Sequence, residues 1–237
     1  MVPNNKTFPC FPIPVSIFNF GKDSHEMNVR LVNDIYDEMD YVQKEGLIRS
    51  NMGGWHSDTM LQYASFVMLK EHIEECIEHY CRNNGYYGDV TIDHFWANVN
   101  SASNYNLMHH HGESLMTGVY YPVKSIEDNQ FVFNYSEEVN LGPGLGELDE
   151  NELERGGALV FQDPNYSLKT KLTIKNGGGP FTHSHYYLYP VSGVLVLFPN
   201  YLLHTVTPFF GSDHKRVSIS FSCEYTDNIK MRDDGNS

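Results

Sequence analysis

The C-terminal segment 215–225 constrains the fold more than any other part of the chain. Apolar and polar residues alternate along it, so an extended strand would carry one set on each face. The apolar set is Val217, Ile219, Phe221, Cys223 and Tyr225, and the polar set is Arg216, Ser218, Ser220, Ser222 and Glu224. Such a strand packs its apolar face on a core and turns its polar face elsewhere. The pattern predicts a sheet protein with one polar interior face.

Further strands are predicted along the rest of the chain after residue 88. They are residues 90–100, 115–123, 130–135, 158–162, 168–174 and 194–198. Many short strands without intervening helices are typical of an antiparallel sandwich or barrel. We therefore expect a mainly β fold.

The first third of the chain has helical periodicity instead. Residues 24–42 carry apolar side chains at the spacing of one buried helix face. A second helix is expected to begin near Ser57, as its N-cap, and to end at Asn84 and Gly85. Between the two helices lies a glycine-broken loop with Trp55 at its tip. We expect a single domain over 1–237, with helical support in 1–88 and a β core in 89–226.

Charge and composition exclude several classes of protein. The chain has 16 Lys+Arg against 30 Asp+Glu, a net charge of −14 that disfavours binding to a nucleic-acid backbone. Its aromatic content of 14% argues against disorder, because such a chain buries enough apolar surface to fold. No apolar run approaches the roughly 20 residues of a membrane span. The beginning of the sequence lacks a secretory signal and its four cysteines form no Cys-x-x-Cys pair, so we expect a cytoplasmic protein.

Histidine is the residue type that points to chemistry, with 12 copies, three of them consecutive. On an extended segment, residues two apart project to the same side. Either His109 with His111, or His111 with Glu113, can therefore supply two metal ligands. His204 follows an apolar strand and is a candidate third ligand. Two ligands close in sequence plus a distant histidine are typical of the facial triad of non-haem Fe(II) oxygenases.

Arg216 and Ser218 lie on the polar face of the last predicted strand. If that face is enclosed, the arginine charge needs an anion. Arginine binds carboxylates in a bidentate manner, and Ser218 on the same side adds a second donor. The pair is suited to the far end of a dicarboxylate cosubstrate.

The order of these motifs resembles that of the 2-oxoglutarate/Fe(II)-dependent dioxygenase superfamily. More narrowly, the chain is similar to the uncharacterised 2-oxoglutarate/Fe(II) oxygenases of marine bacteria and their phages. The matching segments are residues 8–15, 50–57, 95–100, 109–114, 117–121, 161–164, 198–204 and 216–221. The resemblance implies a double-stranded β-helix (jelly-roll) core with helices packed on the major sheet.

The resemblance also implies roles for individual residues. His204 matches the distal iron ligand, Arg216 the residue that pairs with the C5 carboxylate of 2-oxoglutarate, and Ser218 its hydrogen-bonding neighbour. Tyr121 resembles a tyrosine that many relatives direct at the cosubstrate. The implied cofactors are Fe(II), 2-oxoglutarate and O₂, and the implied reaction is hydroxylation with release of succinate and CO₂.

The first motif leaves two ligand sets open. The superfamily pattern of His-x-Asp or His-x-Glu selects His111 and Glu113, whereas the narrower family pattern of His-x-His selects His109 and His111. His111 belongs to both sets.

Several other residues have two interpretations each. Asn98 and Asn100, on a predicted strand near the motif, either bind cosubstrate or substrate or form structural hydrogen bonds. Trp55 either covers the pocket or packs against the second helix. His183 and His185 lie in a glycine-rich segment that we expect to be a surface loop or a substrate lid.

Two other functional classes compete with this one. A cupin-like three-histidine metalloenzyme would not use 2-oxoglutarate and would leave Arg216 facing solvent or a core carboxylate. A non-catalytic jelly-roll binding module would use the histidines only as ordinary surface and core residues. The sequence leaves the substrate open between a small molecule and a protein residue, and it leaves the oligomeric state open.

Overall fold

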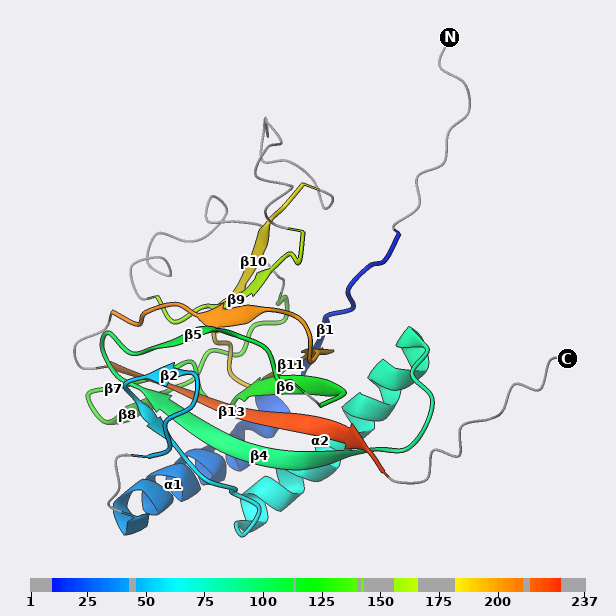
Figure 1. Cartoon of the computed structure of the whole chain (residues 1–237). Helices are drawn as coiled ribbons and strands as arrows, with labels where there is room; N and C mark the ends of the chain where they lie inside the picture. Colours follow the sequence, from blue (N-terminus) through cyan, green and yellow to red (C-terminus); the bar gives the residue numbers. More distant parts are fainter. Residues whose placement is uncertain are drawn as a thin grey trace, which may run out of the picture.

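Two antiparallel sheets face each other, and two long helices cover the outer side of the larger sheet (Figure 1). The computed structural model describes residues 10–42, 46–112, 114–139, 142, 156–165, 182–210 and 214–226. The elements are β1 (Ser16–Asn19), a 3₁₀ turn η1 (Gly21–Ser24), α1 (His25–Val42), β2 (Asn51–Met52), β3 (Trp55–His56), α2 (Ala64–Asn84), β4 (Val90–Asn100), β5 (Tyr105–His109), β6 (Met116–Tyr121), β7 (Ser125–Glu127), β8 (Gln130–Val132), β9 (Leu159–Gln162), β10 (His185–Leu188), β11 (Val194–Pro199), β12 (His204–Val206) and β13 (His214–Tyr225). Within the described part of the chain, no helix is long and apolar enough to cross a membrane.

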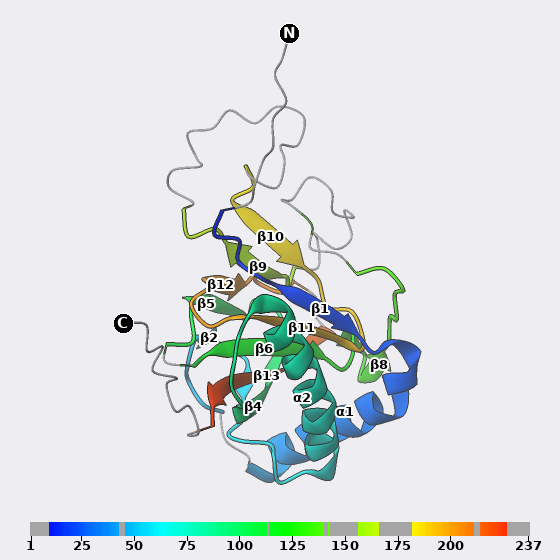
Figure 2. The same cartoon turned by 90° about the vertical axis from the view of Figure 1, so that its right-hand side faces the viewer.

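The larger sheet has the strand order β1-β11-β6-β13-β4-β3, with β7 paired to β13 and β8 paired to β7. The smaller sheet has the order β10-β9-β12-β5-β2. In Figure 2, which turns the molecule by 90°, the larger sheet separates the helices from the smaller sheet. This arrangement confirms the predicted mainly β fold with N-terminal helices on the major sheet.

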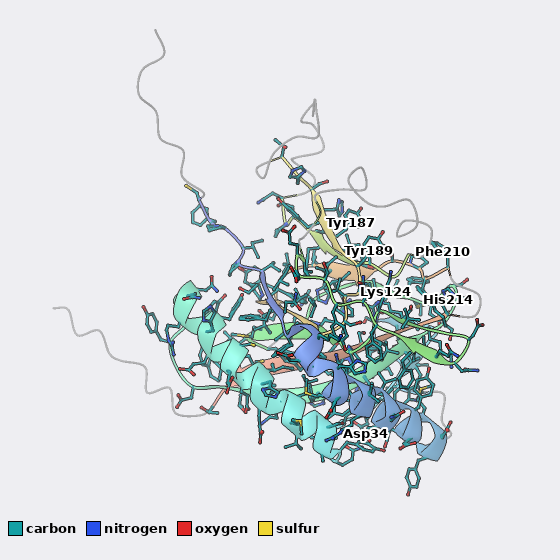
Figure 3. All side chains as sticks on the ribbon, turned by 180° about the vertical axis from the view of Figure 1, so that it is seen from behind. Asp34, Lys124, Tyr187, Tyr189, Phe210 and His214 are labelled. Carbon is teal, nitrogen blue, oxygen red and sulfur yellow. The ribbon has the colours of Figure 1, made fainter. Side chains whose placement is uncertain are left out.

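The core between the helices and the larger sheet is built from the apolar face of β13 and from one stripe of each helix. Its fully buried side chains include Leu31, Ile35, Phe66, Leu69, Ile73, Phe95, Tyr120, Val217, Ile219 and Phe221. The two helices are also tied to each other, because the hydroxyl of Ser65 in α2 donates to the carboxylate of Asp34 in α1 (labelled in Figure 3). The helices therefore cover the apolar face of β13, and its polar face points into the interior of the sandwich.

A second apolar cluster lies between the two sheets. It comprises Val119, Tyr121, Leu159, Phe161, Leu188, Val194, Val196, Phe198, Leu202 and Val206. The cluster fills only part of the space between the sheets. The rest of that space is lined by the polar face of β13, as the alternation in the sequence predicts.

Two adjacent glycines carry the chain from one sheet to the other. Gly53 and Gly54 both have positive φ, at +71° and +72°, and they separate β2, at the edge of the smaller sheet, from β3, at the edge of the larger one. A side chain at Gly54 would also lie 2.9 Å from Oδ1 of Asn100. Only glycine fits this corner without strain.

The predicted elements compare well with the observed ones where the periodicity is long. The first helix and the strands at residues 90–100 and 215–225 are confirmed, as is the helix stop at Gly85, which has φ +74°. The predicted strand at 168–174 lies outside the described residues.

The predicted start of the second helix is wrong. The helix begins at Ala64, and Ser57 instead continues the edge of the larger sheet beside β4. The backbone N–H of Ser57 donates to the carbonyl of Ala97 at 3.0 Å, and its Oγ accepts from the N–H of Ala97 at 2.9 Å. The serine hydroxyl accepts a hydrogen bond from the backbone of β4 here. A short polar side chain can form this bond as well as it can cap a helix, so the sequence alone does not distinguish the two.

We expect Phe95→Ala to destabilise the fold strongly. Phe95 is fully buried and makes edge-to-face contacts with Phe66 of α2 and Phe221 of β13. Removing a buried phenylalanine costs about 3–5 kcal/mol of unfolding free energy. Urea unfolding followed by circular dichroism measures the loss, with Phe210→Ala as the exposed control, expected to change stability by less than about 0.5 kcal/mol. Equal stability of the two variants would contradict this account of the core.

Candidate metal centre

Three histidines meet at one end of the smaller sheet. His109 is the last residue of β5 and His204 is the first residue of β12, and the two are paired across the antiparallel register. His111 follows β5, and its backbone N–H donates to the carbonyl of Asn200 at 3.0 Å. Neither short strand is evident from sequence periodicity, so their pairing is what brings residues 95 positions apart into contact.

The ring nitrogens of the three histidines are spaced for a metal ion. One nitrogen from each ring lies within 4.8 Å of those from the other two, and Nε2 of His111 lies 3.2 Å from Nε2 of His204. Two nitrogens that each lie about 2.1 Å from one metal, at angles between octahedral and tetrahedral, are about 3.0–3.4 Å apart. The separation of His111 and His204 fits this geometry, and the nitrogen of His109 lies within 4.8 Å of both.

Backbone carbonyls set the tautomers of two of these rings. Nδ1 of His109 donates to the carbonyl of Leu107 at 2.7 Å, and Nδ1 of His204 donates to the carbonyl of Leu202 at 2.8 Å. In the neutral imidazole the other nitrogen, Nε2, then carries a lone pair. Such a hydrogen bond on the far nitrogen is the usual way a protein orients a metal-binding histidine.

Burial keeps the three rings neutral. Desolvation lowers the pKa of His111 to about 4 and that of His204 to about 3, and it lowers the pKa of His109 in the same direction. Neighbouring histidines add to each shift, because a second positive charge nearby is unfavourable. The unprotonated form, which is the one that binds metals, is therefore present at neutral pH.

Two polar residues that sequence reasoning missed contact this cluster. Nδ2 of Asn106 donates to Oγ of Ser50 at 3.1 Å, and Ser50 lies 3.3 Å from Nε2 of His109. Because Nδ1 of His109 is already a donor, Ser50 donates its hydroxyl hydrogen to Nε2. A metal would use this same lone pair, so the Ser50 hydroxyl would have to turn away when a metal binds. The sequence shows only a serine beside the glycine-broken loop. Its contact with His109 could not be predicted, because it depends on the pairing of β2 with β5.

Arg216 lies on the polar face of β13, inside the sandwich, and is 2% exposed. Its Nε donates to the carbonyl of Gly157 at 2.9 Å, Nη1 to Oγ of Ser218 at 2.9 Å and Nη2 to the hydroxyl of Tyr121 at 3.2 Å. Gly157 has φ +74°, and a side chain there would lie 3.2 Å from Cδ of Arg216. The three acceptors hold the guanidinium in one orientation.

The charge of Arg216 has no carboxylate partner among the described residues. A guanidinium has five N–H donors, and the three hydrogen bonds leave one on Nη1 and one on Nη2. The N–H groups that remain on the two terminal nitrogens can donate to a carboxylate. Burial raises the pKa of the Tyr121 hydroxyl, so this group stays protonated and neutral.

The histidines and Arg216 open onto the same cavity, which has a volume of about 600 Å³. Its lining includes the polar residues Asn98, Ser218, Ser220 and Ser222 and the apolar residues Val119, Leu159 and Val206. The described residues thus fit both a metal ion, through three neutral imidazoles, and a carboxylate, through a buried arginine that lacks an anion.

The other residues singled out in the sequence occupy different positions. Asn98 lines the cavity, whereas Asn100 is 1% exposed and donates to Oδ1 of Asn106 at 3.5 Å. Trp55 is buried in the core shared with the helices, which is the second of its two predicted interpretations. Glu113 lies outside the described residues.

His185 was expected in a loop, and this expectation is wrong. It is the first residue of β10 and pairs with Gln162 of β9. The pairing with β9 extends the smaller sheet by one edge strand, which the glycine-rich sequence before it conceals.

Comparison with known proteins assigns the class. Residues 94–222 match the family described as "Putative 2OG-Fe(II) oxygenase". This match spans more than half of the 237 residues, so the chain belongs to that family and is an oxidoreductase. Its cofactors are those expected, Fe(II) and 2-oxoglutarate. By sequence, the chain matches no curated protein.

Solved structures share the fold at low sequence identity. A prolyl-4-hydroxylase from Pseudomonas putida is 12% identical with a TM-score of 0.54, over 90% of this chain and 94% of that chain. A prolyl hydroxylase from Trichoplax adhaerens is 14% identical with a TM-score of 0.53, over 89% and 83%. The epimerase SnoN from nogalamycin biosynthesis is 12% identical with a TM-score of 0.55, over 90% and 77%. These similarities confirm the predicted jelly-roll core.

The lowered histidine pKa values predict how acid affects the metal-free protein. The unfolded chain binds protons at these histidines near pH 6.5, whereas the folded chain does so only near pH 3–4. The unfolded state therefore holds more protons in this window, and stability falls as the pH falls. His204→Gln should reduce the slope of unfolding free energy against pH, between pH 6 and 4, by up to about 1.4 kcal/mol per pH unit. Parallel curves for variant and wild type in chemical denaturation would contradict the assignment of a buried neutral His204.

Proposed function

We propose that the protein is an Fe(II)- and 2-oxoglutarate-dependent dioxygenase that hydroxylates a C–H group of its substrate and releases succinate and CO₂. The metal ligands are His109, His111 and His204, and Arg216 binds the C5 carboxylate of 2-oxoglutarate. One observation supports the proposal most directly. A cluster of three neutral histidines shares one cavity with a buried arginine that lacks a carboxylate partner in the described part of the chain.

The choice of His109 over Glu113 as third ligand is part of this proposal. It is supported by the strand register that places His109 opposite His204, and by the carbonyl of Leu107, which leaves Nε2 of His109 as the basic nitrogen. Three neutral ligands would leave two positive charges on Fe(II), which favours binding of an anionic cosubstrate.

The residues of the chain prepare the site for the reaction. Bound Fe(II) and 2-oxoglutarate would supply the activation of O₂. Arg216 positions the cosubstrate, and the hydroxyls of Ser218 and Tyr121 hold the guanidinium in place. The hydroxyl oxygen of Tyr121 accepts a hydrogen bond from Arg216. The hydroxyl hydrogen of Tyr121 can then donate to the C5 carboxylate of 2-oxoglutarate. Val119, Leu159 and Val206 add apolar surface to the lining of the same cavity.

The competing classes are less well supported. A cupin-like enzyme without 2-oxoglutarate predicts an Arg216 that faces solvent or a core carboxylate, whereas the residue is buried and without such a partner among the described residues. A non-catalytic module does not agree with membership of an oxygenase family.

Arg216→Ala is expected to abolish 2-oxoglutarate binding while the metal site stays intact. Loss of one partner from a buried, hydrogen-bonded charge pair costs about 2–5 kcal/mol, or about thirty-fold to several thousand-fold in affinity. Anaerobic calorimetry of 2-oxoglutarate into the Fe(II)-loaded protein measures this change. Arg30→Ala, on the exposed face of α1, is the matched control and should bind as wild type does. Wild-type affinity in Arg216→Ala would show that the cosubstrate is anchored elsewhere.

Removing single histidines tests the ligand set. His204→Ala leaves two of three imidazoles, and we expect it to retain less than about a tenth of the wild-type iron, since even indirect partners of ligands change affinity by about 10–100-fold. His79→Ala, in α2 and away from the cavity, serves as the control. His109→Ala and Glu113→Ala distinguish the two candidate third ligands by iron content after anaerobic purification. Loss of iron in Glu113→Ala but not in His109→Ala would show that the ligands are His111, Glu113 and His204 and not three histidines.

A further inference from the structure

The large cavity has a charge that is opposite to the charge of the whole chain. The protein carries a net charge of −14, yet the described lining of this cavity contains two arginines and no Asp or Glu, and its buried histidines are neutral. One of the arginines is Arg216, whose partner is the proposed cosubstrate. The other, Arg49, has no role in the site described above.

Arg49 is held at the mouth of the cavity, beside the histidine cluster. Its side chain is exposed, while its backbone N–H donates to Oδ1 of Asn51 at 2.7 Å. The next residue, Ser50, contacts Nε2 of His109 through its hydroxyl and accepts from the N–H of Leu107 at 2.9 Å through its carbonyl. These contacts hold the backbone at Arg49 in place, and the neighbouring residue Ser50 touches the histidine cluster directly.

The guanidinium of Arg49 forms no ion pair within the described ranges of the chain. Burial lowers the pKa of His56 in the same lining; repulsion by Arg49 adds a smaller lowering effect, and Asp58 acts in the opposite direction. The lining of the cavity therefore includes an exposed arginine whose charge is available to a ligand.

A flat aromatic surface lies on the wall of the same cavity. The rings of Trp96 and His56 stack with an interplanar angle of 10° and centroids 5.7 Å apart, and Trp96 also lies 5.9 Å from the ring of His111. The apolar side chains of Leu107 and Met108 line the cavity and are about half exposed. A ligand that entered past Arg49 would meet apolar and aromatic surface next to the histidines.

From these features we infer that the substrate oxidised by this protein is a small organic anion. Its carboxylate or phosphate pairs with Arg49 at the mouth, and its apolar or planar part contacts Trp96, Leu107 and Met108 beside the histidine cluster. The inference rests on the proposed dioxygenase function and adds the chemical class of the substrate. A cavity of about 600 Å³, shared with 2-oxoglutarate, has the size of a small-molecule site.

The test uses two pairs of probes, in each of which one member carries an anionic group and the other is neutral. Indole-3-acetate is compared with indole-3-acetamide, and phenyl phosphate with phenol. Each is titrated, without O₂, into protein loaded with Fe(II) and saturated with 2-oxoglutarate, so that Arg216 is already occupied. Ligand-observed NMR gives the affinities. We expect the anion of at least one pair to bind about tenfold or more tightly than its neutral partner, which is the typical value of a charge-assisted hydrogen bond. The pair that shows the difference identifies a carboxylate or a phosphate.

Variants assign the preference to Arg49. Arg49→Gln should remove it, Arg49→Lys should retain part of it, and Arg30→Gln should leave it unchanged, while the affinity for 2-oxoglutarate is the same in all three. The inference is wrong if wild type shows no preference for either anion, if neither member of either pair binds, or if the preference survives in Arg49→Gln. A failure of the proposed function is distinguishable, because then 2-oxoglutarate itself would not bind to the iron-loaded wild type.

Discussion

The burial of one positive charge between two sheets is the constraint on which the rest of the structure depends. Arg216 is almost fully removed from water, and a buried charge is costly unless hydrogen bonds and an anion compensate for it. The protein supplies three acceptors, from Gly157, Ser218 and Tyr121, and none of them carries a negative charge. The compensation is therefore incomplete in the chain alone. We propose that the dicarboxylate cosubstrate supplies the missing negative charge when it binds.

The two faces of β13 explain why the helices are needed. The apolar face is covered by α1 and α2, which form the larger core with β4 and β6. On the opposite face of the strand, Arg216, Ser218, Ser220 and Ser222 line the cavity. Across the cavity, the pairing of β5 with β12 supplies the histidines. The arginine and the histidine cluster thus come from opposite sheets, and the separation of the sheets sets the space available for the cosubstrate.

Long periodic segments made much of this fold predictable from the sequence. The alternation in β13, the apolar stripe of α1 and the extent of β4 were all evident, because each depends on local side-chain patterning. The cluster of His109, His111 and His204 was predicted from residue type and order. The strands that hold it were not predicted, because β5 and β12 have five and three residues and are stabilised by pairing with distant segments. Ser50, Asn106 and Arg49 were missed for the same reason, and Ser57 was misassigned because a cap and a strand edge use the same side chain.

The account is tested most directly by an anaerobic crystal structure of the protein with Fe(II) and 2-oxoglutarate, with the metal located by anomalous scattering at the iron edge. We predict one iron peak within about 2.1–2.2 Å of a ring nitrogen of each of His109, His111 and His204. We also predict the C5 carboxylate of 2-oxoglutarate on the two free N–H groups of Arg216. An iron peak away from these three rings, or a 2-oxoglutarate carboxylate that does not contact Arg216, would contradict the central claim.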